Sequence, residues 1–262
     1  MPDTSLHIAL VGNPNSGKSS LFNALTGLNQ KVGNFPGVTV DKKTGMSSLE
    51  PGFTANIIDL PGTYSLYPRR ADEWVSYKVL MHVDVHVKPD LVVLVADASN
   101  LKRNLLFCSQ MIDLKIPVVV ALTMVDLAAK KGIKIDLEEL ERELGVAVVS
   151  INPRKNKGLP QLKKVLAQTA RQQYKAPLRD FIGIKGLAED AVHAVQQIFP
   201  ALPDYAAVHY LINHENFPLA PEIQDKIERI ETANNFNATR MQAEEIMQRY
   251  SRIRQIMQQS VV

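Results

Sequence analysis

A glycine-rich segment near the start of the chain limits its possible folds more than any other feature. Residues 12–19 read Gly-Asn-Pro-Asn-Ser-Gly-Lys-Ser, which matches the pattern G-x-x-x-x-G-K-[ST]. The segment follows an apolar run at 7–11, typical of a buried strand, and precedes a helical pattern at 18–25. In that setting the backbone N–H groups face phosphate oxygens, and the N-terminus of the helix adds partial positive charge. The sequence therefore predicts a phosphate-binding loop.

This loop carries most of the predicted nucleotide contacts. We expect Lys18 to reach the β- and γ-phosphates and the hydroxyl of Ser19 to bind Mg²⁺. The predicted nucleotide-binding residues of the segment are Gly12, Asn13, Pro14, Asn15, Ser16, Gly17, Lys18, Ser19 and Ser20. The loop alone does not distinguish ATP from GTP.

Two further segments are typical of nucleotide-sensing switches. Asp59-Leu60-Pro61-Gly62 matches D-x-x-G at the end of a predicted strand, so we expect Asp59 to hold Mg²⁺ through water and the Gly62 N–H to sense the γ-phosphate. Thr39 lies in a stretch with no periodicity, and its hydroxyl can join Mg²⁺ when a γ-phosphate is present. We therefore predict a first switch at 27–40, taken to be a loop, and a second at 60–72. The predicted Mg²⁺ ligands are Ser19, Thr39 and Asp59.

The predicted base contacts favour guanine. Thr123-Met124-Val125-Asp126 follows a predicted strand, where GTPases carry N-[KM]-x-D, and a carboxylate there accepts both N1–H and N2–H₂ of guanine. Thr123 replaces the usual asparagine, so we expect weaker but still guanine-selective binding. In the last base-contacting loop Pro153 has no N–H for the guanine O6, and the residue that caps the base is left open. The predicted base contacts are Thr123, Met124, Asp126, Ser150 and Asn152.

Alternating strands and helices predict an α/β fold with a mostly parallel sheet over the first 170 or so residues. The predicted strands are at 7–11, 42–49, 54–59, 91–97, 118–123 and 147–151, with helices at 18–25, 101–114, 136–144 and 159–173. After Pro177 only helical patterns remain, at 186–199, 205–214, 221–234 and 239–258. We predict a nucleotide-binding domain at 1–172 and a small all-helical domain at 173–262.

Charge and composition exclude some classes of function. From Phe181 onward there are 7 basic and 10 acidic residues, which leaves 23 and 17 in the first 180. An acidic C-terminal part disfavours nucleic-acid binding, because phosphate neutralisation supplies most non-specific affinity. The sequence shows no signal peptide and no apolar run of membrane-spanning length, so we expect a soluble, cytosolic chain. The single cysteine, Cys108, is expected to be buried and reduced.

Four segments together resemble the FeoB ferrous-iron transporters. They are GNPNSGKSSLFNALTG, VGNFPGVTV, IDLPGTYSL and DASNLKRNL, and the resemblance is strong over the first 170 residues. It implies a Ras-like P-loop GTPase domain, then a helical regulatory domain, then a polytopic membrane region, at the cytoplasmic face of the bacterial inner membrane. The implied partner is the chain's own C-terminal membrane domain, with Fe(II) as the transported ion; a homo-oligomer is left open.

The resemblance also implies potassium activation. Asn15 matches an asparagine that helps ligate K⁺ beside the phosphates in potassium-activated members, and backbone near Gly33 would complete the site. A cation there offsets charge developing between the β- and γ-phosphates. Thr63 stands where Ras-like enzymes have a water-positioning glutamine, so slow intrinsic hydrolysis is expected. The predicted catalytic residues are Asn15, Lys18, Thr39 and Gly62.

Several alternatives stay open. The chain could be a soluble potassium-dependent GTPase acting on tRNA or ribosomes, or a slow GDP/GTP-sensing interaction module. His82 and His86 could face one side of a strand and bind iron, although a solvated segment is the favoured interpretation. Glu138, Glu139, Glu141 and Glu143, and Arg249, Arg252 and Arg254, are expected to lie on the surface.

Overall fold

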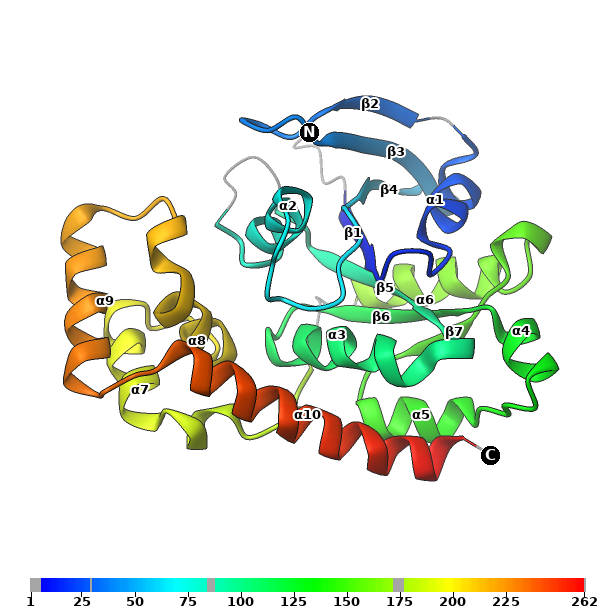
Figure 1. Cartoon of the computed structure of the whole chain (residues 1–262). Helices are drawn as coiled ribbons and strands as arrows, with labels where there is room; N and C mark the ends of the chain where they lie inside the picture. The colour runs from blue at the N-terminus through cyan, green and yellow to red at the C-terminus, as the bar shows by residue number, and fades with distance from the viewer. Residues whose placement is uncertain (1–5, 29, 84–87, 172–176, 262) are drawn as a thin grey trace.

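A computed structural model describes residues 6–28, 30–83, 88–171 and 177–261. Within these residues seven strands form one sheet, in the order β2-β3-β4-β1-β5-β6-β7 (Figure 1). The strands are β1 (Leu6–Gly12), β2 (Gln30–Asn34), β3 (Asp41–Glu50), β4 (Phe53–Asp59), β5 (Leu91–Asp97), β6 (Val118–Thr123) and β7 (Val148–Ser150). β4, β1, β5, β6 and β7 run parallel, whereas β2 and β3 are antiparallel to their neighbours. The predicted α/β fold with a mostly parallel sheet is confirmed.

Helices cover both faces of the sheet. The helices of this part are α1 (Lys18–Thr26), α2 (Ala71–Leu80), α3 (Leu101–Asp113), α4 (Val125–Lys130), α5 (Leu137–Leu144) and α6 (Leu159–Arg171). One core cluster joins α1 and α6 to the sheet, and a second joins α2, α3 and α5 to the opposite face. Because β1, β5 and β6 are buried on both sides, they are apolar along almost their whole length.

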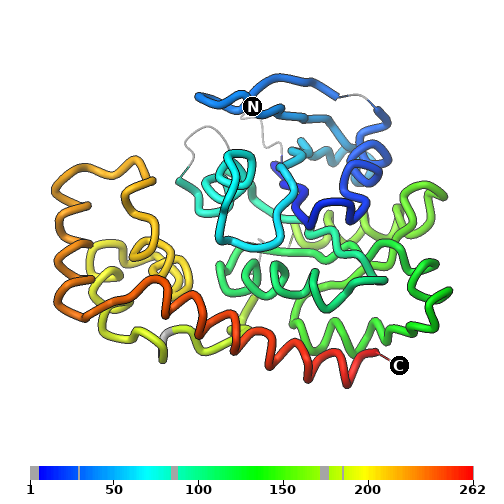
Figure 2. Tube along the Cα trace, viewed as in Figure 1, coloured from blue at the N-terminus to red at the C-terminus, as the bar shows by residue number. Residues whose placement is uncertain are grey.

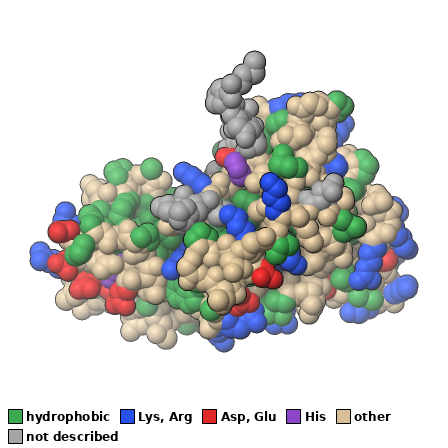
Figure 3. Space-filling model, turned by 90° about the horizontal axis from the view of Figure 1, so that it is seen from above, with side chains coloured by type: hydrophobic (Ala, Val, Ile, Leu, Met, Phe, Trp, Pro, Cys, Tyr) green, Lys and Arg blue, Asp and Glu red, His purple; other side chains and the backbone are tan. Residues whose placement is uncertain are grey.

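The C-terminal part is helical, as predicted. It contains α7 (Glu189–Ile198), α8 (Asp204–Asn213), α9 (Pro221–Ala233) and α10 (Ala238–Ser260). The first three gather at one end of the molecule, and the long α10 then returns beneath α3 and α5 (Figure 2). The Asp136 N–H donates to the Ser260 carbonyl over 2.8 Å, so α10 is fixed at its far end too. Figure 3 shows acidic side chains gathered at the helical end of the molecule.

One local prediction is wrong, and two helices were not predicted. Residues 27–40 are not a loop throughout, because Gln30–Asn34 forms the edge strand β2; all five residues are exposed, so no apolar alternation marks it. The helix α2 was not predicted, because its buried side chains lie all around the helix rather than on one stripe. The short α4, with 6 residues, is too brief for periodicity to reveal.

The predicted surface position of Arg249 is also wrong. Its side chain, on α10, is 0% exposed and pairs with Asp113 of α3 at 2.7 Å and with Glu245 one turn earlier. Burial raises the pKa of Asp113, while the Arg249 guanidinium and the Phe181 N–H act in the opposite direction. The guanidinium of Arg252 lies over the Phe181 ring, and Arg254 is exposed as expected. Sequence reasoning missed Arg249 because the neutralising Asp113 is 136 positions away.

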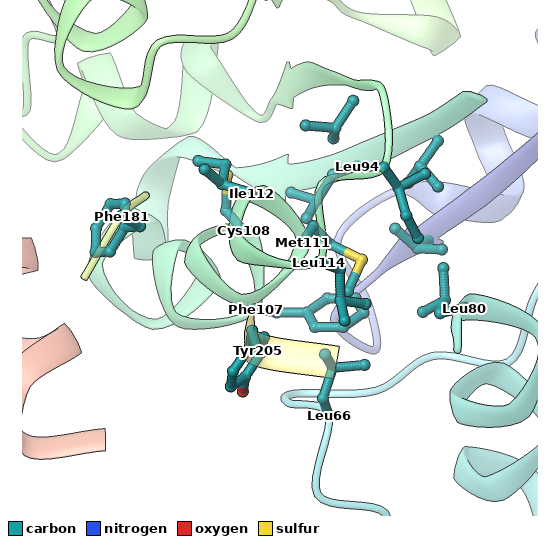
Figure 4. Packing of buried hydrophobic residues seen from close by; sticks show 14 of the residues in the cluster. Leu66, Leu80, Leu94, Phe107, Cys108, Met111, Ile112, Leu114, Phe181 and Tyr205 are labelled. Atoms are coloured by element: carbon teal, nitrogen blue, oxygen red, sulfur yellow. The ribbon is translucent and has the colours of Figure 1, made fainter. Parts of the chain in front are cut away.

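Cys108 lies inside the core around α3, and burial raises the pKa of its thiol to about 12 (Figure 4). No helix in the described part of the chain is both long and apolar enough to cross a membrane. Of the predicted histidine pair, His86 lies outside the described residues. In the ranges that are described, no group of three or more His, Cys, Asp or Glu side chains is arranged to hold a metal ion.

Candidate nucleotide-binding site

A pocket of about 720 Å³ opens at the carboxyl ends of the parallel strands. This edge of a parallel α/β sheet is where ligands bind, because the loops there leave a crevice between them. The loops after β1, β4, β6 and β7 all contribute. The lining residues are Asn13, Pro14, Asn15, Gly17, Lys18, Ser19, Ser20, Gly62, Arg70, Asp72, Thr123, Met124, Asp126, Asn152, Pro153 and Arg154.

The loop between β1 and α1 has the shape that phosphate binding requires. At Gly12, with φ +155°, an added Cβ would lie 2.4 Å from the Val95 carbonyl oxygen, so no larger residue fits. α1 begins at Lys18, and the N–H groups of its first turn have no acceptor within the helix. Asn13 Nδ2 and Ser16 Oγ are buried without a hydrogen-bond partner among the described residues. The loop therefore offers unused donors to an anionic ligand, and a nucleotide phosphate fits it.

The D-x-x-G turn is bonded directly to this loop. The Thr63 N–H donates to the Gly12 carbonyl over 3.2 Å, and a Cβ on Gly62 would meet the backbone of Pro14 at 3.2 Å. Lys18 Nζ forms an ion pair with Asp59 Oδ1, and both side chains are about nine-tenths buried. The two residues predicted to hold phosphate and Mg²⁺ therefore neutralise each other in this structure.

The base end of the pocket is built from the loops after β6 and β7. Asn152 Nδ2 lies 3.4 Å from Asp126 Oδ2, and the Leu127 N–H donates to the other carboxylate oxygen over 3.0 Å. The Ile151 and Asn152 N–H groups are engaged with the Leu122 and Lys157 carbonyls. Since Pro153 has no N–H, the side-chain amide of Asn152 is the donor that the loop places beside Asp126.

The structure brings most of the predicted contacts together, but not all. Gly12 and Ser16 lie buried in the loop, and Asp59 contacts Lys18, which lines the pocket. Thr39 and Gly33 are exposed and do not line the pocket, and neither does the half-buried Ser150. Sequence reasoning did not single out Arg70, Asp72 and Arg154 as lining residues. Arg70 and Asp72 form an ion pair of 3.2 Å. Both fall within the predicted second switch, and this was the feature of the sequence that could have indicated that they line the pocket.

Beyond the D-x-x-G turn, the second switch rests on α3. The Leu66 N–H donates to Gln110 Oε1 over 2.8 Å, and Gln110 Nε2 lies 3.4 Å from Glu245 Oε1 on α10. Figure 4 shows Leu66, from the switch, and Tyr205, from α8, packed beside Phe107 of α3. The Gln110 side chain of α3 therefore contacts both the second switch and the helical part.

A loop with the phosphate-binding motif that shares one sheet edge with a separate aspartate after β6 is the arrangement of a Ras-like P-loop GTPase domain, and this is the class of the chain. The sequence profile described as Ferrous iron transport protein B matches residues 6–166. The chain therefore belongs to the ferrous iron transport protein B family.

Individual relatives agree with this assignment. The Fe(2+) transporter FeoB of Leptospira biflexa is 46% identical over 162 residues, which cover 62% of this chain and 23% of that protein. The solved cytosolic domain of L. pneumophila FeoB is 33% identical with a TM-score of 0.77, covering 98% of this chain and 99% of that one. The cytosolic domain of T. maritima FeoB in its GMPPNP form is 30% identical with a TM-score of 0.80, covering 98% and 99%. The chain spans about a fifth of the length of the curated relatives it matches.

Proposed function

We propose that this chain binds and hydrolyses GTP, and that it does so as part of a ferrous-iron transporter. The observation that carries the proposal is the placement of Asp126 and Asn152 in the same pocket as the Lys18 loop. Asp126 accepts N1–H and N2–H₂ of guanine, the Asn152 amide donates to O6, and the phosphate loop holds the phosphates. GDP-bound and GMPPNP forms of relatives support nucleotide binding at this fold.

The residues present fit a magnesium ion, which would offset negative charge on the β- and γ-phosphates. Ser19 lines the pocket and Asp59 lies beside Lys18, whereas Thr39 must move to join them. We expect the Gly62 N–H to bind a γ-phosphate oxygen, and Lys18 to stabilise charge on the same group during in-line attack by water. Thr63 provides no side-chain amide at the position where Ras-like enzymes have a water-orienting glutamine, so we expect intrinsic turnover to be slow.

We expect single-turnover GTP hydrolysis to be faster in KCl than in NaCl. Asn15 lines the pocket, and a potassium ion held there would stabilise the charge that develops in the transition state. If it lowers the activation free energy by about 1.4 kcal/mol, the rate rises about tenfold. Quench-flow or phosphate-release assays in the two salts at equal ionic strength measure this. Equal rates would remove the potassium claim alone, whereas no hydrolysis in either salt would favour a nucleotide-sensing module.

Asp126→Asn is expected to weaken GDP binding by about a hundredfold. A charge-assisted hydrogen bond worth about 1.5–3 kcal/mol is lost, and the asparagine N–H₂ would face an N–H donor of guanine. Xanthine carries a carbonyl in place of the guanine N2 amine, so XDP should bind the variant more tightly than GDP does. Isothermal titration calorimetry with both nucleotides measures the exchange. Asp225→Asn, an exposed aspartate on α9, is the matched control. Unchanged GDP affinity in Asp126→Asn would show that the base is read elsewhere.

The proposed domain organisation is a GTPase domain at 1–172 and a helical domain at 173–262, at the cytoplasmic face of the inner membrane. The helical domain would respond to the nucleotide state, and the contact of Gln110 with both Leu66 and Glu245 supports this. Nucleotide-dependent conformational change would then regulate Fe(II) passage through a membrane domain of the same protein. Iron uptake by cells that carry the full-length protein, with and without Lys18→Ala, tests this part.

A further inference from the structure

Thr123 occupies an unusual place at the end of β6. Its side chain is 2% exposed, and Oγ1 lies 2.6 Å from the Ser16 carbonyl oxygen and 3.1 Å from the Ala96 carbonyl oxygen. A Cβ on Gly17 would lie 3.6 Å from the Thr123 methyl carbon. The side chain therefore fills the space between the phosphate loop and the ends of β5 and β6.

The chemistry of a hydroxyl limits what Thr123 can do there. A threonine hydroxyl has one proton, and the Ser16 and Ala96 carbonyl oxygens are both acceptors. Guanine N7 is a third acceptor and needs a donor as well. If Thr123 turned its proton to N7, the Ser16 carbonyl would lose its short hydrogen bond at a buried position, which is unfavourable. The hydroxyl therefore donates its proton to a backbone carbonyl of the protein and not to the base.

The other amide near the base has no N–H left for N7. If guanine binds with its N1 and N2 edge on Asp126 and its phosphates in the loop, its imidazole edge faces the end of β6. The Asn152 amide has two N–H donors: one is directed at Asp126 Oδ2, and the proposed function uses the other for O6. An amide at position 123 would carry two N–H donors, one for Ser16 and one for the base, whereas threonine has only the first.

We propose that Thr123 is a positioning residue that ties the phosphate loop to β5 and β6, and that this site recognises guanine without a hydrogen bond to N7. The inference rests on the proposed guanine-nucleotide binding and specifies which edge of the base is read. It predicts that the site accepts purine nucleotides altered at position 7 as readily as unmodified ones, while alterations at N1 or N2 are rejected.

The test compares GDP with 7-deaza-GDP, which has a C–H in place of N7, on the 262-residue chain by calorimetry. We expect the two dissociation constants to agree within about threefold, since no hydrogen bond is lost. A larger loss of affinity for 7-deaza-GDP would overturn the inference. Absence of GDP binding and GTP hydrolysis would instead refute the proposed function.

Variants at position 123 complete the test. Thr123→Val, which removes the donor, should weaken both nucleotides equally and by about fivefold or more, whereas Thr123→Ser should bind both like the unmodified chain. Thr123→Asn should gain a preference for GDP over 7-deaza-GDP of about fivefold or more. For Thr123→Val, a loss of affinity for GDP but not for 7-deaza-GDP would contradict the assignment, and so would unchanged affinity for both nucleotides. For Thr123→Asn, the absence of a new preference for GDP would contradict it. If Thr123→Val does not fold, the serine and asparagine variants decide it.

Discussion

Lys18→Ala is expected to reduce GTP hydrolysis by about a thousandfold, because the cation that stabilises charge on the transferred phosphoryl group is lost from a water-poor site. The Lys18 side chain is 12% exposed and has Asp59 as its partner. Removing it also leaves the Asp59 carboxylate uncompensated beside the phosphates, which further disfavours an anionic ligand. Single-turnover hydrolysis and calorimetric GDP binding measure the two effects.

Lys164→Ala is the matched control, because Lys164 is an exposed lysine on α6. Lys164→Ala should leave both the rate of GTP hydrolysis and the affinity for GDP unchanged. A further variant, Asp59→Asn, keeps the shape of the site and should reduce hydrolysis while retaining GDP binding better than Lys18→Ala does. Full activity of Lys18→Ala would show that the loop after β1 does not bind the phosphates.

Arg249→Met is expected to lower the free energy of unfolding by about 3–5 kcal/mol, the usual result when one partner of a buried ion pair is removed. The substitution preserves most of the side-chain volume but leaves Asp113 and Glu245 without their cation. Burial already raises the pKa of Asp113, and loss of Arg249 raises it further above the unfolded-state value. The stability deficit should therefore be smaller at acidic pH, where the carboxyl is protonated, than at neutral pH.

Urea unfolding followed by circular dichroism and by the fluorescence of Trp74, the single tryptophan, measures the change. Arg254→Met is the control, because Arg254 is exposed on the same helix. A loss of less than 1 kcal/mol, about the size of a surface ion pair, would mean that α10 is not anchored through this cluster.

The phosphate end of the site could be predicted from sequence because its residues are close along the chain. Gly12, Lys18 and Ser19 belong to one short segment whose spacing fixes its shape, and Asp59 is the last residue of β4, which pairs with β1. The sheet was also predictable, since its central strands are continuous apolar runs. The order of these strands brings the loops to one edge of the sheet, so local patterns were enough to place Asp126 near the phosphate loop.

The remaining features depend on contacts between distant segments. The local sequence around Arg249 is typical of an exposed helix, and only the fold brings Asp113 of α3 into contact with it. The sequence around Gln110 also gives no indication of its contact with Leu66. Likewise, the residue identity at Thr123 showed that an asparagine was missing, but only its contacts with Ser16 and Ala96 show what the hydroxyl does instead.

The ion pair between Lys18 and Asp59 has a thermodynamic consequence under the proposed function. A nucleotide that takes Lys18 releases Asp59, and a metal that takes Asp59 releases Lys18, so whichever ligand arrives first bears the free energy of separating the pair. The second ligand then binds to a residue already set free. Their binding is therefore positively linked and, by reciprocity, magnesium raises the affinity for nucleotide by the same factor as nucleotide raises the affinity for magnesium.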